Sequence, residues 1–206
     1  MMLPFQQFLA DAANRGEAVN TLFEERLFSL VGVLHRVAES LSAADIPYEV
    51  VGGLAVLIHV EEASPENTTL TRDVDLMIRR ADLERVKTAV ARDGFRFRHS
   101  AGLDMLIFGA TESAKNAVHL VFAGEKVRPD YVQPAPAIAP QRKQIHGKEV
   151  MVIPVADLVQ MKLTSNRDRD RVHIRSLDAA GLITPDLERN LKPELAERLR
   201  HIRETE

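Results

Sequence analysis

Two aspartates separated by one residue, Asp73 and Asp75, are the side chains of this sequence best suited to hold a metal ion. Acidic and apolar residues alternate over residues 71–78, a pattern that predicts a β-strand with both carboxylates on one face. Two carboxylates that converge on one small volume repel each other unless a cation sits between them, and magnesium prefers such oxygen ligands. Magnesium held in this way takes its other ligands from water and substrate phosphates, as phosphoryl transfer requires.

A pair of glycines, Gly52 and Gly53, fits the same chemistry. The short β-prone segment 48–51 precedes them and the apolar segment 54–58 follows, so strand, glycine turn and helix is the expected order. Glycines at such a junction let the backbone approach a triphosphate, and the first turn of the helix offers unpaired N–H groups to an anion. The junction therefore predicts a phosphate-binding turn.

Regular elements surround these two motifs. Apolar periodicity predicts a long helix that begins at Asn20 and ends before Pro47, and a second helix over residues 81–93. Further strands are expected at 95–99, 103–108, 117–122 and 150–153, and the proline-rich connector 129–140 cannot supply a central strand. The remainder is helical: it begins at residue 155, restarts near Ser165, stops at Gly181 and closes with short helices after Pro185 and Pro193.

Composition limits the classes of protein that the chain can belong to. With 206 residues, 45% of them hydrophobic, it can bury a real core, and we expect one compact unit with an appendage. A formal net charge of -3 gives the whole molecule no general attraction to nucleic acid, so any such contact needs a local basic patch. The absence of cysteine excludes disulfides, thiolate nucleophiles and cysteine zinc sites and fits a reducing compartment. With no secretory leader and no apolar stretch of the roughly 20 residues that cross a bilayer, we expect a soluble cytoplasmic protein.

The motifs together resemble a known family. The segments VVGGLAVLIH and TRDVDLMI resemble the polymerase-beta-type nucleotidyltransferases, specifically the AbiEii-like toxin nucleotidyltransferases. Similarity continues in AVHLVFAGEKVRPDY and DLVQMKLTSNRDRDRVHIRSLDAAGLI. The resemblance implies a mixed α+β fold, a small mixed sheet flanked by helices, with residues 1–153 forming N-terminal helices plus the core and residues 154–206 a helical extension packed on it.

The same resemblance implies roles for individual residues. Asp73 and Asp75 are the expected catalytic ligands of one or two magnesium ions, and an NTP is the expected substrate. The expected nucleotide-binding residues are Gly52, Gly53, Thr71, Arg72, Lys126, Arg128, Lys162 and Arg169. On one continuous helix Lys162, Asn166, Arg169 and His173 share a face, whereas a helix break at Ser165 would destroy that alignment.

One residue departs from the family pattern. Many members carry a third carboxylate on a later core strand, where this chain reads Val118-His119-Leu120-Val121. His119 occupies that position, and Glu125, just beyond the strand, is the expected substitute as a metal ligand. Asp104, on the preceding strand, is the weaker candidate. The alternative for Glu125 is an ordinary surface ion pair with a neighbouring basic residue.

The favoured activity is transfer of a nucleoside monophosphate from an NTP to a hydroxyl on tRNA or protein, in a toxin-antitoxin setting with an antitoxin-like partner. The main rival is a catalytically degenerate module that binds a nucleotide or a partner protein. A third interpretation is an antitoxin-type nucleotidyltransferase that modifies a partner toxin. The seven histidines show no zinc-ligand spacing and no Gly-x-Ser-x-Gly elbow is present, so zinc and serine-hydrolase chemistry are not expected.

Overall fold

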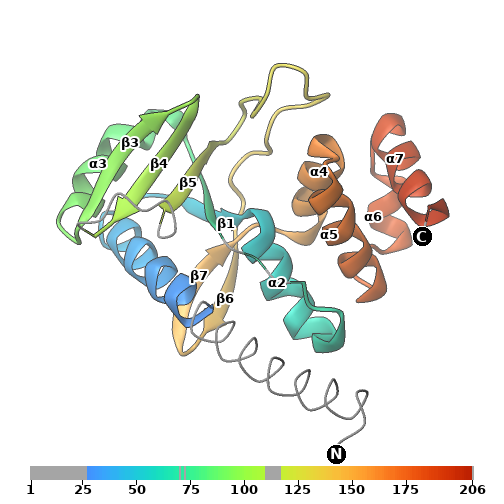
Figure 1. The fold of residues 1–206 in the computed structure, drawn as a ribbon, viewed down its shortest axis with the longest axis horizontal. Helices are drawn as coiled ribbons and strands as arrows, with labels where there is room; N and C mark the ends of the chain where they lie inside the picture. The colour runs from blue at the N-terminus through green and yellow to red at the C-terminus, as the bar shows by residue number, and fades with distance from the viewer. Residues whose placement is uncertain (1–26, 70, 72, 110–116, 206) are drawn as a thin grey trace, which may run out of the picture.

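The centre of the protein is one mixed β-sheet. The computed structural model describes residues 27–69, 71, 73–109 and 117–205, and its seven strands follow the order β3-β4-β5-β2-β1-β7-β6 (Figure 1). Their bounds are β1 (Tyr48–Val51), β2 (Val74–Ile78), β3 (Phe95–Ser100), β4 (Leu103–Phe108), β5 (Ala117–Phe122), β6 (Gln141–Ile145) and β7 (Lys148–Val152). The predicted mixed α+β class is confirmed.

The two central strands carry the motifs. Strand β1 runs antiparallel to β2, with Val51 opposite Asp75, and β2 runs parallel to β5, with Asp75 opposite His119. Paired residues point to the same face of a sheet, so Val51, Asp75 and His119 share one face. Their neighbours Val50 and Leu76 point to the other face and are fully buried.

Helices cover the sheet and extend beyond it. An N-terminal helix, described over residues 27–43, is followed by α2 (Gly52–Ala63) and α3 (Leu83–Ala91). The C-terminal part holds α4 (Val155–Ser165), α5 (Asp168–Ala179), α6 (Pro185–Arg189) and α7 (Pro193–Glu204), which gather at one side of the molecule, next to α2 (Figure 1). Short 3₁₀ turns, η1 (Pro65–Asn67) and η2 (Arg80–Asp82), lie before β2 and α3. None of the helices in the described part of the chain is both long and apolar enough to span a membrane.

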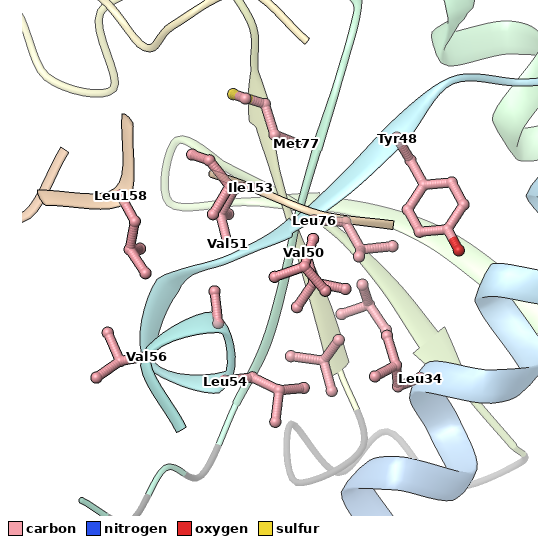
Figure 2. Packing of buried hydrophobic residues seen from close by; sticks show 14 of the residues in the cluster. Leu34, Tyr48, Val50, Val51, Leu54, Val56, Leu76, Met77, Ile153 and Leu158 are labelled. Carbon is pink, nitrogen blue, oxygen red and sulfur yellow. The ribbon is translucent and has the colours of Figure 1, made fainter. Parts of the chain in front are cut away.

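The hydrophobic core fills both sides of the central strands. Figure 2 shows Leu34 of the N-terminal helix on the same side of the sheet as Tyr48 and Leu76, whereas Met77 and Val51 point the other way. These side chains are at most 2% exposed. Burying one such side chain contributes about 1.5–3 kcal/mol, so the strands that carry Asp75 and the glycine turn are firmly positioned.

The connector 129–140 is attached to the same face of the sheet as Asp75. The amide N–H of Ala139 donates to Oε1 of Glu49, and Gln133 donates to Gln160 of α4. Glu49 is fully buried on β1, and burial raises its pKa to about 7 although the bond from Ala139 acts in the opposite direction. The connector contributes no strand, as its prolines predict.

Several element boundaries differ from the predictions. Strand β2 begins at Val74, so Asp73 immediately precedes it. Strand β6 was not predicted: its side chains are largely exposed and polar, and it pairs only with β7 across a turn in which His146 and Gly147 both have positive φ. The predicted start of the first helix at Asn20 lies outside the described residues.

Candidate functional site

The glycine turn lies directly against Asp75. Gly52 follows β1 with a φ of +69°, and a Cβ built on it would lie 1.9 Å from Oδ2 and 2.7 Å from Cγ of Asp75. No side chain other than hydrogen fits in that space, and the positive φ independently favours glycine. The sequence therefore uses glycine here to bring the start of α2 into contact with the carboxylate.

Helix α2 begins at this contact without a side-chain cap. Its N-cap is Val51, and its first turn holds no acidic residue. The first N–H groups of a helix have no partner within the helix and carry a partial positive charge, which makes them suitable donors to phosphate oxygens. The turn thus places a helix terminus that can bind an anion beside a carboxylate, so a cation would be needed between that carboxylate and a phosphate bound at the terminus.

His119 holds the other oxygen of Asp75. Its Nδ1 donates to Oδ1 of Asp75 across 3.2 Å. This bond, together with the charges of Asp75 and Asp73, raises the pKa of His119 against the opposing effect of burial. Both carboxylates therefore lie within electrostatic reach of the same imidazole. The side chains of Asp73 and Asp75 are 42% and 26% exposed, so solvent reaches both.

The segment before β2 runs along α5. Thr69 and Ser176 share a hydroxyl–hydroxyl hydrogen bond at one end of this contact. At the other end, Nη1 of Arg169 lies 3.7 Å from Oδ2 of Asp73. Ser176 and Arg169 lie seven residues apart, about two helical turns, and so on one face of α5. Helix α5 thus fixes the position of the segment that leads into the aspartate pair.

Gly53 is enclosed in the middle of that contact. A Cβ built on Gly53 would lie 2.6 Å from Oγ1 of Thr71 and 3.3 Å from Cε1 of His173. The predicted nucleotide-binding residue Thr71 therefore packs against the glycine turn. Any side chain at Gly53 would push apart the segment before β2 and helix α5.

Lys162 is buried beside another carboxylate, that of Asp170. It is 6% exposed, and its Nζ lies 3.1 Å from Oδ1 of Asp170, a residue that is itself fully buried. Asp170 also accepts hydrogen bonds from Ser165 and from the Arg167 side chain, at 2.6 and 2.7 Å. Burial lowers the pKa of Lys162, and the charges of Asp170 and Asp75 oppose that shift. Lys162 therefore lies within electrostatic reach of Asp75.

Asp170 organises the junction of α4 and α5. Burial alone would raise its pKa, but the hydrogen bond from Arg167 and the charge of Lys162 outweigh burial and hold the pKa well below its usual range. Asp170 also forms a capping box with Arg167, the N-cap of α5. The helix restart predicted near Ser165 therefore has Arg167 as its N-cap, where serine is the more usual N-cap residue.

The expected helix break near Ser165 is present, but it does not separate Lys162 from Arg169 and His173. Helix α4 ends at Ser165, and its C-cap Asn166 has a φ of 46° and donates its backbone N–H to the carbonyl of Lys162. Helix α5 then packs back against α4 and α2. Positive charge from Lys162 and Arg169 acts on His173 in this arrangement, so the three residues converge without a continuous helix.

His173 is the least satisfied polar group of the site. Its side chain is 1% exposed, and neither ring nitrogen has a hydrogen-bond partner among the described residues. Leaving a buried polar group unpaired costs about 1–3 kcal/mol. Burial first, and then the charge of Lys162, lowers its pKa to about 4, so the ring is neutral at pH 7.

The structure does not bring Glu125 to the aspartate pair, contrary to the prediction. Both of its oxygens bind Arg80, whose guanidinium lies 3.4 Å from the ring centre of Phe122 and 3.4 Å from Asp104. Asp104 pairs with Leu120, the neighbour of His119, and therefore faces the opposite side of the sheet from His119.

The remaining predicted nucleotide-binding residues are not placed at the aspartate pair. Lys126 and Arg128 are exposed just after β5, and no contact recorded for residues 117–205 links them to the aspartate pair. Arg72 lies outside the described residues. The cations that the structure does place around Asp73 and Asp75 come instead from the α4–α5 junction: Lys162, Arg167 and Arg169.

The donor set fits magnesium that takes most of its ligands from a substrate. Within the described ranges, no group of three or more histidine, aspartate or glutamate side chains could hold a metal ion. Asp73 and Asp75 supply two carboxylates, and magnesium commonly binds through one or two carboxylates plus phosphate oxygens and water. The glycine turn keeps the start of α2, with its unpaired N–H groups, against Asp75.

Comparison with known proteins identifies the fold. By sequence, the chain matches no protein-family model and no curated protein. By structure, it is similar to an antigenic nucleotidyltransferase-like protein from Paracoccidioides brasiliensis (TM-score 0.57, 20% identity, 86% of this chain and 88% of that one). It is also similar to ANT(2")-Ia in complex with adenylyl-2"-tobramycin (TM-score 0.52, 14% identity, 85% and 97%).

A third similar structure is the Megavirus polyadenylate synthase (TM-score 0.51, 10% identity). The match covers 87% of this chain and 37% of the synthase, so the chain corresponds to about a third of that larger protein. The chain therefore has the nucleotidyltransferase fold. Assignment to the AbiEii-like branch within that fold stays a prediction.

Proposed function

We propose that this protein, built on the nucleotidyltransferase fold, transfers a nucleoside monophosphate from an NTP to a hydroxyl group and releases pyrophosphate. The observation that supports this most directly is the contact of the Gly52 backbone with Asp75. It joins an uncapped helix start, suited to phosphates, to a carboxylate, suited to magnesium. A magnesium–triphosphate complex satisfies both groups at once.

Each part of the site has a task in this reaction. The backbone N–H groups at the start of α2 hold the triphosphate, and Gly52 and Gly53 allow the close approach. Asp73 and Asp75 are the ligands that would hold magnesium, which when bound neutralises charge on the phosphates. Lys162 and Arg169 face the same volume and offset the negative charge that grows on the leaving pyrophosphate.

The bond changes are those of a single displacement at the α-phosphorus. The acceptor hydroxyl oxygen bonds to the α-phosphorus, the bond from that phosphorus to the oxygen bridging to the β-phosphorus breaks, and pyrophosphate departs with that electron pair. The hydroxyl proton is released to solvent. The nucleoside monophosphate stays on the acceptor as a phosphodiester.

For the acceptor we propose a hydroxyl on RNA, with the end of a tRNA as the first candidate and a protein side chain as the second. Support comes from the sequence resemblance to AbiEii-like toxin nucleotidyltransferases, which also suggests a toxin-antitoxin setting with a protein partner. The similar structures include a polyadenylate synthase and a protein bound to an adenylylated aminoglycoside, so RNA and small-molecule hydroxyls both belong in the test.

One observation favours a second function, the binding of a nucleotide or a partner protein without catalysis. His119 stands on β5 beside Asp75, where many members of the fold family carry a third carboxylate, and Glu125 is occupied by Arg80. Two-metal chemistry needs more negative charge than Asp73 and Asp75 supply. In the binding module, the same groups would hold a nucleotide with a single magnesium ion.

The test is a transfer assay with each NTP, labelled at the α-phosphate, together with magnesium. Total RNA, a protein extract and tobramycin are the acceptors. We expect label to enter RNA with one preferred NTP, and label in protein or tobramycin alone would overturn the RNA proposal. If magnesium and NTP raise the melting temperature but nothing is labelled, the binding module is the correct function.

Two variants make the assay specific to the site. Asp75→Asn should abolish both the transfer and the magnesium-dependent part of the NTP stabilisation, because one metal ligand is lost. Glu125→Gln is the matched control: it also neutralises one carboxylate, but on the opposite face, and should leave transfer unchanged. Equal losses in the two variants would contradict the site described here.

A further inference from the structure

A buried histidine without partners lies behind the glycine turn. His173 is 1% exposed, its two ring nitrogens have no hydrogen-bond partner in the described part of the chain, and Cε1, the ring atom between them, lies 3.3 Å from the position of a Cβ on Gly53. The ring edge that carries both unpaired nitrogens therefore lies next to Gly53, part of the turn that receives the phosphates in the proposed function. A donor left unpaired at a binding turn is available to the ligand of that turn.

The groups around His173 are mostly cationic. Lys162 faces it from α4, Arg167 and Arg169 from the first residues of α5, and Asp170 is the one anion among them. The loop and α2 contribute the uncharged Thr71 and Gly53. In the absence of a ligand the ring is thus kept neutral by burial and by neighbouring positive charge. A bound polyphosphate would reverse the sign of the local charge.

We propose that His173 is a ligand of the triphosphate: one ring nitrogen donates to a phosphate oxygen seated on Gly53, and the ring takes up a proton when the phosphates bind. This inference rests on the proposed function, because it requires phosphates at the glycine turn. The proton comes from solvent, and no covalent bond changes. Binding then satisfies a donor that is otherwise buried without a partner, which ties affinity for the phosphates to pH.

The experiment uses magnesium tripolyphosphate as a probe, since it carries the phosphates without a base. Calorimetric titration of the full chain in two buffers of different ionisation enthalpy, at roughly pH 5.5, gives the protons taken up on binding. That pH lies between the pKa of about 4 in the free protein and the ordinary value of 6.5. His173→Gln removes the titrating ring and keeps a polar side chain. The number of protons that the parent takes up on binding, minus the number that His173→Gln takes up, is the contribution of His173.

His59→Gln is the matched control. His59 is also buried, at 3% exposed, and burial also lowers its pKa, but its Nε2 already has a partner in the carbonyl of Ile153. We expect this control to take up protons as the parent does. His173→Gln should lose that uptake and about tenfold in affinity for the probe at this pH, with a smaller loss above pH 8.

A second measurement, the NMR signal of the His173 ring in the parent protein, does not depend on whether the variant folds. The ring carbon signal of His173 in the labelled parent should move toward its protonated position when tripolyphosphate is added. If the probe and every NTP fail to bind the parent, the proposed function and this inference both fall. If they bind while the His173 signal stays fixed, or the uptake persists in His173→Gln, only this inference is overturned.

Discussion

Replacement of Gly52 by alanine tests the contact on which the site depends. The new methyl carbon would lie 1.9 Å from Oδ2 of Asp75, so that carboxylate must turn away. The metal ligand and the phosphate turn would then no longer face the same volume. We expect Gly52→Ala to lose magnesium-dependent NTP binding while the fold is retained.

The size of the effect follows from three contributions. An alanine at positive φ costs about 1–2 kcal/mol. Turning Asp75 away from a staggered conformation costs about 0.5–1.5 kcal/mol, and losing its hydrogen bond from His119 costs about as much, roughly 0.5–1.5 kcal/mol. The variant should therefore be destabilised by about 2–5 kcal/mol.

Gly102 offers a matched control for the backbone contribution alone. Its φ is +75°, and a Cβ built there meets nothing within 4 Å. Gly102→Ala should lose stability only through the alanine at positive φ. Gly52→Ala also turns Asp75 and breaks its hydrogen bond from His119, so it should be less stable than Gly102→Ala by about 1–3 kcal/mol. Urea unfolding gives both free energies, and thermal shift with magnesium and each NTP gives the binding.

Two results would refute this reasoning. If the two alanine variants are equally stable, the approach of Asp75 to Gly52 is not as close as the structure shows. If Gly52→Ala keeps the full magnesium-dependent NTP shift, then the metal site does not depend on Asp75 facing the turn. The second outcome would also remove the main support for the proposed function.

Two further predictions concern the buried carboxylates. Burial raises the pKa of Glu49 to about 7, so the folded protein keeps a proton that the unfolded chain releases above pH 4.5. The parent should therefore lose about 3 kcal/mol of stability as the pH rises from 4.5 to about 7. Glu49→Gln should remove that slope and be the more stable protein above pH 7, and a parent with a flat profile would show that Glu49 is not buried as described. Asp170→Asn should destabilise by about 3–5 kcal/mol at neutral pH, because Lys162 is left buried without its counter-ion. Because the pKa of Asp170 is lowered in the folded state, its contribution to stability is present above pH 3.8 and is lost as the pH falls below that value. The unfolding free energies of the parent and of Asp170→Asn should therefore converge on acidification. A difference that stays constant with pH would contradict the ion pair.

Local sequence was sufficient to predict the strand that carries Asp75 and the strand–glycine–helix junction at Gly52. The alternation around Asp73 and Asp75 and the strand–glycine–helix order at Gly52 depend on neighbouring residues, which is why they could be recognised without a structure. Lys162 was predicted from the family resemblance, and its pairing with Asp170 was not predicted.

Long-range packing decided the features that were missed. Glu125 was expected near the aspartates because it follows β5 closely, but sheet register and Arg80 direct it to the other face. Asp170 was given no role from sequence, and His173 was expected to share a helix face with Lys162, but the packing of α5 against α4 and α2 buries both residues. Strand β6 has a polar edge sequence, and the available signal was the His146-Gly147 pair, whose positive φ values suit a two-residue hairpin turn.

The anchoring of the segment before β2 to α5 also determines where the chain can change in length. Thr69 binds Ser176 of α5, and Asp73 lies against Arg169 of the same helix. The four residues from Thr69 to Asp73 therefore span the same length as about two turns of α5. Residues inserted upstream, around the η1 turn, would extend a surface loop and leave the aspartates where they are, since lengthening such a loop adds little closure entropy. One residue inserted between the anchors would turn Asp73 away from its partner, so related sequences should vary in length before Thr69 and not after it.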